Sequence, residues 1–269
     1  SQQRRAAAPV APRHSWARSI TGDDIINAFH IDVEDVPTEI TEVIAKSDLF
    51  PVETPEPEAP FTPVRELDPG RPALALTFDD GPSSVTPALL DLLDAYQAKG
   101  TFFVLGVQVP GNEGTLQRMH DTGHLIGNHT YNHRYLPELT AEEIQEQLSL
   151  TDDAIEGATG HRTKLFRPTY GEYNDAVQAS TTKPFILWSV DTNDWQYRDA
   201  SHVSNHIIEN AYDGSIILMH DIYETTLEGL KVAIHELINQ GYQLVTVEEL
   251  AYLKGCSLES YQSYYDFRN

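Results

Sequence analysis

The chain has 269 residues, of which 40% are hydrophobic and 22% charged, so it can bury a substantial core and is not wholly disordered. Its 18 basic and 41 acidic residues give a net charge of −23, which argues against nucleic-acid backbones and anionic membranes as partners and favours a neutral substrate. The single cysteine, Cys256, excludes an intrachain disulfide, and no apolar run is long enough to predict insertion of this segment into a membrane.

The N-terminal quarter of the chain differs in composition from the rest. Residues 1–20 carry four arginines and no acid, whereas residues 21–70 carry thirteen acids against two bases, and five prolines between Pro51 and Pro63 are typical of an extended linker. We therefore assign residues 1–70 to an N-terminal arm, a small acidic segment and a Pro/Glu linker, and residues 71–269 to the main domain. Short apolar runs in residues 23–49 leave open a small helix or docking on that domain.

From Arg71 onward, strand-like and helix-like segments alternate. The predicted strands are Ala73–Phe78, Phe102–Leu105, His124–Ile126, Lys164–Phe166, Phe185–Val190, Ile216–Met219 and Leu244–Val247. The predicted helices are Thr86–Ala98, Thr115–Asp121, Thr140–Gly157 (opened by a capping box of Thr140 and Glu143), Asn174–Ala179, Ala200–Ala211, Thr226–Gln240 and Glu248–Lys254. This alternation predicts an α/β fold with a parallel sheet, most simply closed into a barrel of about seven β/α units.

Charged and titratable residues follow five of these strands. In a β/α barrel the carboxyl ends of the strands meet at one rim, which is where such folds place their active sites. We expect that rim to carry Asp79 and Asp80, His129 and His133, Arg167, Asp191 with Asp194 and Trp195, and His220 with Asp221.

Two of these pairs have the spacing of a metal site. His129 and His133 are four residues apart, which on a helical turn places both on one face, and a carboxylate would complete a set with positions left open for water and substrate. Surface or capping histidines are the alternative. Asp79 and Asp80 are adjacent on a strand end and are expected to point to opposite sides, one as a ligand and one as a base; a plain Asp-Asp-Gly-Pro turn is the alternative.

The remaining rim residues admit two interpretations each. His220 is a candidate general acid because imidazole titrates near neutral pH, or else a buried structural histidine. Arg167 can orient a carboxylate or pair on the surface, and Trp195 can stack on a sugar or belong to the core. The other histidines have no convergent partners in the sequence and are expected to be structural.

Five stretches of the sequence resemble, in order, the motifs of the polysaccharide deacetylases, the carbohydrate esterase family 4 enzymes with a NodB homology domain. They are Thr77-Phe78-Asp79-Asp80-Gly81-Pro82-Ser83, Asn128-His129-Thr130-Tyr131-Asn132-His133, Arg167-Pro168-Thr169-Tyr170-Gly171, Asp191-Thr192-Asn193-Asp194-Trp195 and Leu218-Met219-His220. The resemblance covers roughly residues 71–254. It implies a distorted (β/α) barrel and metal-dependent removal of acetyl groups from N-acetylated sugars.

The resemblance also implies a role for individual residues. It implies that Asp79 is the base, that His220 is the acid tuned by Asp191, and that Arg167 orients the base. It implies a divalent metal, first of all zinc with cobalt, nickel or manganese as alternatives, on Asp80, His129 and His133. The backbone N–H of Tyr170 would hold the oxyanion, and Trp195, Tyr170 and Leu218 would contact substrate. Thr169 departs from the pattern, since a second proline is usual there, so a slightly looser loop is expected.

The expected substrate is a carbohydrate polymer, and the sequence looks most like bacterial cell-surface members acting on N-acetylglucosamine of peptidoglycan. Chitin or chitooligosaccharides and acetylxylan are the alternatives within the family. From other classes, a catalytically silent sugar-binding module and a non-haem iron oxygenase with a two-histidine, one-carboxylate site remain open. The resemblance, together with the arm and the Pro/Glu linker, predicts an extracellular or cell-surface bacterial protein, and the start at Ser1 is compatible with a removed signal peptide or membrane anchor; the oligomeric state is not indicated.

Overall fold

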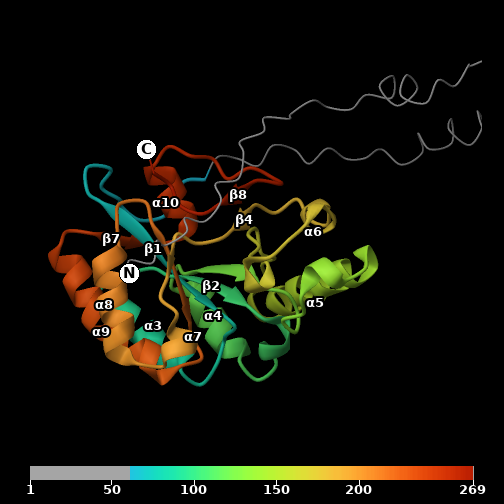
Figure 1. Cartoon of the computed structure of the whole chain (residues 1–269), viewed down its shortest axis with the longest axis horizontal. Coiled ribbons are helices and arrows are strands. Elements are labelled where there is room, and N and C mark those ends of the chain that lie inside the picture. The colour runs from blue at the N-terminus through green and yellow to red at the C-terminus, as the bar shows by residue number, and fades with distance from the viewer. Residues whose placement is uncertain (1–60, 269) are drawn as a thin grey trace, which may run out of the picture. The chain divides into compact units, whose positions relative to one another are not determined.

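A computed structural model describes residues 61–268, and the proposed arm, the acidic segment and most of the proposed linker lie outside the described residues. Figure 1 shows strands gathered in the middle of the described part with helices around them. The central strand is β1 (Ala73–Asp79), in which all seven residues are buried. Its almost uninterrupted apolar sequence is the pattern of a parallel strand covered on both faces.

Every strand pairing of the main sheet is parallel, in the order β3-β2-β1-β6-β5. The partners of β1 are β2 (Thr101–Val104), β6 (Ile216–His220) and β7 (Gln243–Val245), and the outer strands are β3 (Leu125–Asn128) and β5 (Val190–Asp191). The register sets Asp79 beside His220. It also sets Asp191 beside Leu218. The carboxyl ends of these strands therefore meet, as the sequence predicts.

Single residue pairs connect β3 to β4 (Phe185–Ile186). Phe166 bridges Asn128 of β3 on one side and Phe185 of β4 on the other. The predicted strand Lys164–Phe166 is therefore reduced to one bridging residue, and the predicted strand Phe185–Val190 is broken into β4 and β5. The α/β fold with a distorted (β/α) barrel is confirmed, and these short bridges are its irregular part.

A short strand that the sequence pattern does not reveal covers β4. This strand, β8 (Ser263–Tyr264), comes from the C-terminal segment and pairs in parallel with β4. The Tyr173 and Ser263 hydroxyls lie 2.7 Å apart beside it. Two residues are too few for a period-2 pattern to stand out in a sequence.

The helices occupy the predicted places with small shifts of their ends. They are α3 (Thr86–Ala95), α4 (Glu113–Asp121), α5 (Ala141–Thr159), α6 (Asp175–Ala179), α7 (Asp194–Tyr197), α8 (Ala200–Asn210), α9 (Glu224–Asn239) and α10 (Val247–Leu253), with 3-10 turns at Gly106–Gln108, Leu136–Glu138 and Thr169–Gly171. The capping box of Thr140 and Glu143 is confirmed at the start of α5. Only α7 is unanticipated, and it directly precedes α8.

Two further observations concern the edges of the described part. Arg65, which precedes the assigned domain start at residue 71, donates to Glu249 Oε1 over 2.7 Å and also to the Leu244 carbonyl. Among the helices between residues 61 and 268, none is long and apolar enough to cross a membrane.

Candidate active site

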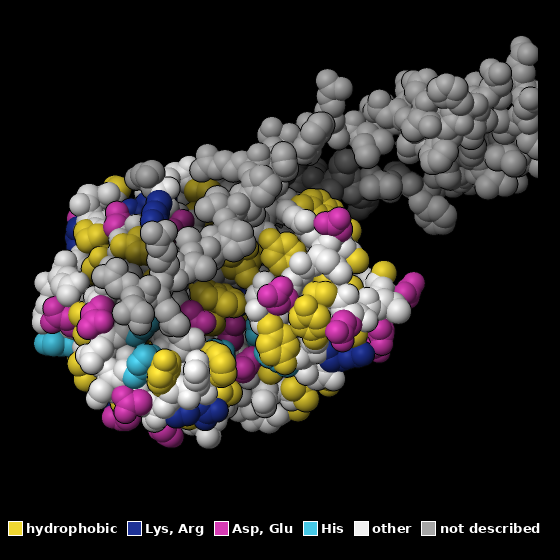
Figure 2. Space-filling view, in the orientation of Figure 1, with side chains coloured by type: hydrophobic (Ala, Val, Ile, Leu, Met, Phe, Trp, Pro, Cys, Tyr) yellow, Lys and Arg dark blue, Asp and Glu magenta, His cyan; other side chains and the backbone are white. Residues whose placement is uncertain are grey.

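A cavity of about 360 Å³ opens where the carboxyl ends of β1, β3, β5 and β6 meet. Figure 2 shows this face of the molecule with acidic and histidine side chains at the bottom of a hollow and hydrophobic side chains around it. The cavity is lined by Asp79, Asp80, His129, His133, Tyr170, Trp188, Asp191, Trp195, Leu218, His220 and Tyr223. The structure thus brings most of the predicted rim residues to the surface of one cavity, whereas Arg167, Asp194 and Asp221 are buried around it.

Three of the lining residues converge in the manner of metal ligands. Asp80 Oδ1 lies 3.4 Å from His129 Nε2 and 3.3 Å from His133 Nε2. One ligand atom from each of the three residues lies within 4.8 Å of the others, and no other such group of three occurs among residues 61–268. One carboxylate and two imidazoles form a mixed oxygen and nitrogen set that suits zinc and similar divalent cations.

The hydrogen bonds of this group agree with a cation site. Asp80 Oδ1 is buried and has no hydrogen-bond partner among the described residues. His129 Nδ1 lies 2.7 Å from the Arg167 carbonyl oxygen, to which it can only donate, so the Nε2 of a neutral ring keeps its lone pair free for a cation. Burial lowers the pKa of His133, which favours its neutral form. These residues fit a divalent metal.

The segment that carries His129 and His133 is a loop and not the expected helical turn. Thr130 and His133 have φ values of 74° and 63°, in the left-handed region. Asn128 accepts from the Thr130 N–H through Oδ1, and its amide donates to Asp152 and to the Leu148 carbonyl of α5. The i, i+4 spacing therefore brings the two rings together through a turn held from behind by α5.

The two adjacent aspartates also deviate from the expected alternation. Asp79 is the last residue of β1, but Asp80 has a φ of 74°, so the chain leaves the extended conformation between them. As a result both carboxylates reach His129 Nε2, Asp79 through Oδ2 at 3.5 Å and Asp80 through Oδ1 at 3.4 Å. Burial raises the pKa of Asp80, but contacts with His129 outweigh it and hold that pKa at about 2.

Asp79 is held by a completely buried arginine. Arg167 Nη1 donates to Asp79 Oδ1 and to Thr77 Oγ1, each over 2.8 Å. Its Nε donates to the Ile186 carbonyl and its Nη2 to the Leu187 carbonyl. The centroid of the Phe103 ring lies 4.1 Å from the Arg167 carbon Cζ. Arg167 is thereby fixed on all sides, and it leaves the second oxygen of Asp79 facing the cavity.

The partner of His220 is Asp194, whereas the resemblance assigned this role to Asp191. His220 Nδ1 lies 2.7 Å from Asp194 Oδ1, and Asp194 Oδ2 accepts from the His220 backbone N–H and from Thr226 Oγ1. The register explains this correction, because Asp191 pairs with Leu218, two residues before His220, and the chain then turns at Asn193, whose φ is 51°, before Asp194 begins α7.

The contact between His220 and Asp194 changes the pKa of the histidine. Burial lowers the pKa of His220, but the hydrogen bond and charge of Asp194 outweigh it and raise the pKa to about 9. Asp191 lines the cavity and its pKa is raised by burial. His220 lines the cavity, and its Nε2 lies 4.0 Å from Asp80 Oδ2.

The predicted oxyanion loop lies at the mouth of the cavity. Tyr170 has a φ of 61° and its ring packs on His133, with the ring centroids 4.6 Å apart. Thr169 is buried, and its hydroxyl donates to the Arg134 carbonyl over 2.5 Å. A proline in that position has no hydroxyl, so the threonine connects the Tyr170 loop to the loop of His129 and His133 by a hydrogen bond that proline cannot form.

Sequence reasoning missed some residues of the site. Trp188 and Tyr223 line the cavity, and no motif marks them. Asp221, which the sequence places on the rim, is instead buried beneath the site, where it accepts from Thr86 through Oδ2 at 2.6 Å and has its pKa raised to about 7 by burial. A Cβ added at Gly81 would lie 2.1 Å from Asp221 Oδ2, so the turn after Asp80 requires glycine. That glycine in the Asp-Asp-Gly-Pro stretch is the one local signal of this close approach.

The sequence that forms this cavity is similar to those of known proteins. The family model described as Polysaccharide deacetylase matches residues 66–184. Peptidoglycan-N-acetylglucosamine deacetylase PgdA of Listeria monocytogenes is 42% identical over 194 residues, which are 72% of this chain and 41% of that protein. Peptidoglycan-N-acetylmuramic acid deacetylase PdaC of Bacillus subtilis is 41% identical over 189 residues, 70% of this chain and 40% of that protein. The chain thus spans about two fifths of the length of these relatives.

Solved structures agree over their full length. The structure titled T48 deacetylase with substrate has 40% identity and a TM-score of 0.71, and the match covers 74% of this chain and 100% of that one. A family 4 acetyl xylan esterase from Clostridium thermocellum in complex with a cobalt ion has 32% identity and a TM-score of 0.69, covering 73% of this chain and 100% of that one.

Proposed function

The chain belongs to the polysaccharide deacetylase family, and from this premise we propose that it is a metal-dependent hydrolase of N-acetyl groups on N-acetylglucosamine residues of a polysaccharide, most directly peptidoglycan. The observation that carries the proposal is one juxtaposition. A carboxylate fixed by Arg167 and an imidazole fixed by Asp194 lie on neighbouring strands, next to the Asp80, His129 and His133 group.

In this proposal each side chain performs one step. Asp79 accepts a proton from the attacking water through Oδ2, while Arg167 holds Oδ1. The backbone N–H of Tyr170 stabilises the negative charge that develops on the acetyl oxygen. His220 donates its proton to the departing sugar amine, and Asp194 stabilises the protonated ring before that transfer. Acetate and a free glucosamine unit result.

Asp80, His129 and His133 would hold a divalent cation, zinc in the first place and cobalt, nickel or manganese as alternatives. A divalent cation in this group supplies Lewis acidity toward the acetyl carbonyl and the water. The buried unpaired Asp80 Oδ1 and the Nε2 orientation of His129 support this assignment.

The proposal is tested by acetate release from peptidoglycan, N-acetylglucosamine oligomers and acetylxylan, assayed in parallel with and without added zinc. We expect zinc-dependent release with the highest kcat/KM on peptidoglycan. Preferential release from acetylxylan would instead favour the esterase activity named for the similar Clostridium thermocellum protein. Binding of these polymers without any release would favour the silent sugar-binding module.

We also propose a division of the chain into an N-terminal part and a deacetylase domain. Residues 71–269 are the deacetylase domain, and residues 1–70 are an arm and linker that hold it away from its anchorage at the cell surface or outside the cell. All site residues lie between Asp79 and Tyr223. A chain that starts at Phe61, and so keeps Arg65 bound to Glu249, is expected to retain wild-type kcat on soluble oligomers. A large loss of kcat with an unchanged melting temperature would show that the removed residues take part in the site.

A further inference from the structure

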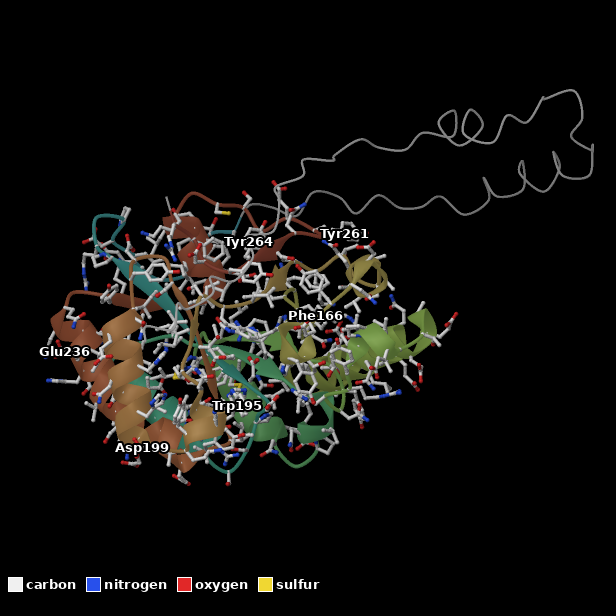
Figure 3. The ribbon with its side chains drawn as sticks, in the orientation of Figure 1. Phe166, Trp195, Asp199, Glu236, Tyr261 and Tyr264 are labelled. Carbon is white, nitrogen blue, oxygen red and sulfur yellow. The ribbon has the colours of Figure 1, made fainter. Side chains whose placement is uncertain are left out.

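One arginine at the mouth of the cavity has no role in the proposed chemistry. Arg198 follows α7, and its Nε donates to the Trp195 carbonyl over 2.7 Å. Its guanidinium carbon lies 3.6 Å from the centroid of the Tyr223 ring. Trp195 and Tyr223 both line the cavity, and the Tyr223 ring centroid is 6.0 Å from that of His220. Arg198 therefore lies at the His220 side of the mouth; Figure 3 labels Trp195 and Asp199 in the same segment.

The charge of Arg198 is not neutralised within the described part of the chain. Arg118, Arg134 and Lys183 each have a carboxylate oxygen within 3.1 Å, as is common in this acidic protein. None of the carboxylates between residues 61 and 268 forms such a pair with Arg198. Its two terminal NH₂ groups donate to no described residue, so a fork of donors suited to a carboxylate remains exposed at the cavity mouth.

The backbone at this position adds an independent observation. Arg198 has a φ of 48° and Asn193 a φ of 51°, so residues in the left-handed region bracket α7. Glycine adopts this conformation without steric cost, whereas a long side chain does so at a cost of roughly 1 kcal/mol. The arginine is held there by its bond to Trp195 and by stacking on Tyr223, and strain of this kind is often found at functional sites.

We propose that Arg198 binds a carboxylate carried by the glycan next to the deacetylated sugar, so that the enzyme prefers an acidic glycan to a neutral one. The inference rests on the proposed deacetylase function and names its substrate class more closely. In a bacterial wall glycan such a carboxylate belongs either to the lactyl ether of a muramic acid unit or to a peptide attached to it. A guanidinium stacked on Tyr223 offers two parallel N–H donors to either.

This inference corrects the simplest interpretation of the net charge. A total of −23 favours a neutral substrate when the whole surface is considered. Fields of exposed charges are screened within about 10 Å at 0.1 M salt, so the distant acids contribute little at the mouth. Arg198 contributes a positive charge at the mouth, and within the cavity Asp79 is paired with Arg167 and Asp80 lies against His129 and His133.

The test compares three oligomers as substrates. Chitotetraose carries no carboxylate, a peptide-free tetrasaccharide of alternating N-acetylglucosamine and N-acetylmuramic acid carries lactyl carboxylates, and its peptide-bearing counterpart carries peptide carboxylates instead. We expect Arg198→Gln to raise KM about tenfold on the oligomer whose carboxylate is recognised. The change on chitotetraose should be severalfold smaller, and Arg198→Lys should recover part of the loss.

The three substrates distinguish a lactyl carboxylate from a peptide carboxylate. They also distinguish failure of the Arg198 proposal from failure of the proposed deacetylase function. A loss on the peptide-free tetrasaccharide assigns the lactyl group, and a loss only on its peptide-bearing counterpart assigns the peptide. Lys231→Gln removes the same charge from an exposed position of α9 and should leave all three KM values unchanged. Equal effects of Arg198→Gln on all three oligomers, or none, would overturn the inference while the deacetylase function stands. Absence of acetate release by the wild-type protein from every oligomer would overturn both proposals.

Discussion

Two hollows of this molecule are lined by histidines, and only one has the organisation of an active site. The second, about 200 Å³, includes His120, His124 and His161 and lies between the ends of α4 and α5. There the His120 and His161 rings stack on each other with centroids 4.1 Å apart. In the active-site cavity, by contrast, each histidine ring faces a carboxylate. The two hollows are therefore distinguished by the carboxylates that lie against the histidine rings, and not by the presence of histidines.

The comparison is sharpest for two buried histidines. Burial lowers the pKa of both His124 and His220. His124 has its nearest Asp94 oxygen 3.7 Å away and Lys99 nearby, and its pKa falls to about 4. His220 has Asp194 at 2.7 Å, and its pKa rises to about 9. The closer carboxylate of Asp194 raises the pKa of His220, whereas burial and the charge of Lys99 lower the pKa of His124.

The largest expected effect comes from the two aspartates that organise the active-site cavity. Asp79→Asn removes the proton acceptor and should lower kcat by about 10²–10⁴-fold, with metal content retained and no rescue by zinc. Asp80→Asn removes an anionic ligand, so metal affinity should fall and excess zinc should restore part of the activity. Acetate release and elemental analysis measure both.

Stability provides the control for this pair. Asp79→Asn leaves the buried Arg167 without its counter-ion. The melting temperature of the Asp79→Asn variant should therefore fall more than that of the Asp80→Asn variant. If zinc rescues Asp79→Asn and not Asp80→Asn, the two roles are exchanged. If neither responds to zinc and both only lose stability, the pair forms a structural turn.

The next effect concerns the proton donor itself. His220→Ala should lower kcat by about 10²–10⁴-fold and leave metal content unchanged, because His220 lies outside the group of three ligands. Elemental analysis of the purified variant checks this. Loss of metal from the variant would place His220 among the ligands.

A smaller effect distinguishes the two aspartates of the Asp191-to-Asp194 stretch. His220 acts in its protonated form, so activity should decline as the pH rises through its folded-state pKa. Asp194→Asn removes the charge that raises this pKa, and the alkaline decline should move to lower pH. Asp191→Asn makes the same chemical change without touching Nδ1 and should shift the pH profile much less. An equal or larger shift with Asp191→Asn would restore the role that the family resemblance gave it.

The smallest effect is expected in the second hollow. His161→Ala separates the stacked pair with His120 on the surface and should change kcat/KM by less than about twofold, because no carboxylate converges on these rings to make them reactive. Acetate release at several pH values tests this. A marked loss of activity with an unchanged melting temperature would mean that the two hollows are functionally connected.

The sequence alone determines the elements whose causes are local. The buried run of β1, the capping box at Thr140 and the apolar period of the helices depend on neighbouring residues, and the predicted helices and most predicted strands are found within a few residues of their places. The residues that gather at the cavity were also predictable, because parallel strands present their carboxyl ends at one edge and five of those ends carry charged groups.

Only the tertiary structure decides which of these residues touch. In the register of β5 on β6, Asp191 lies opposite Leu218, and the carboxylate that contacts His220 is that of Asp194. Such pairing depends on contacts between residues far apart in the chain. Left-handed residues at Asp80 and Arg198 redirect side chains that a strand or helix period would place elsewhere. These conformations are stabilised by packing and not by local preference, which is why the sequence named the site but not all of its contacts.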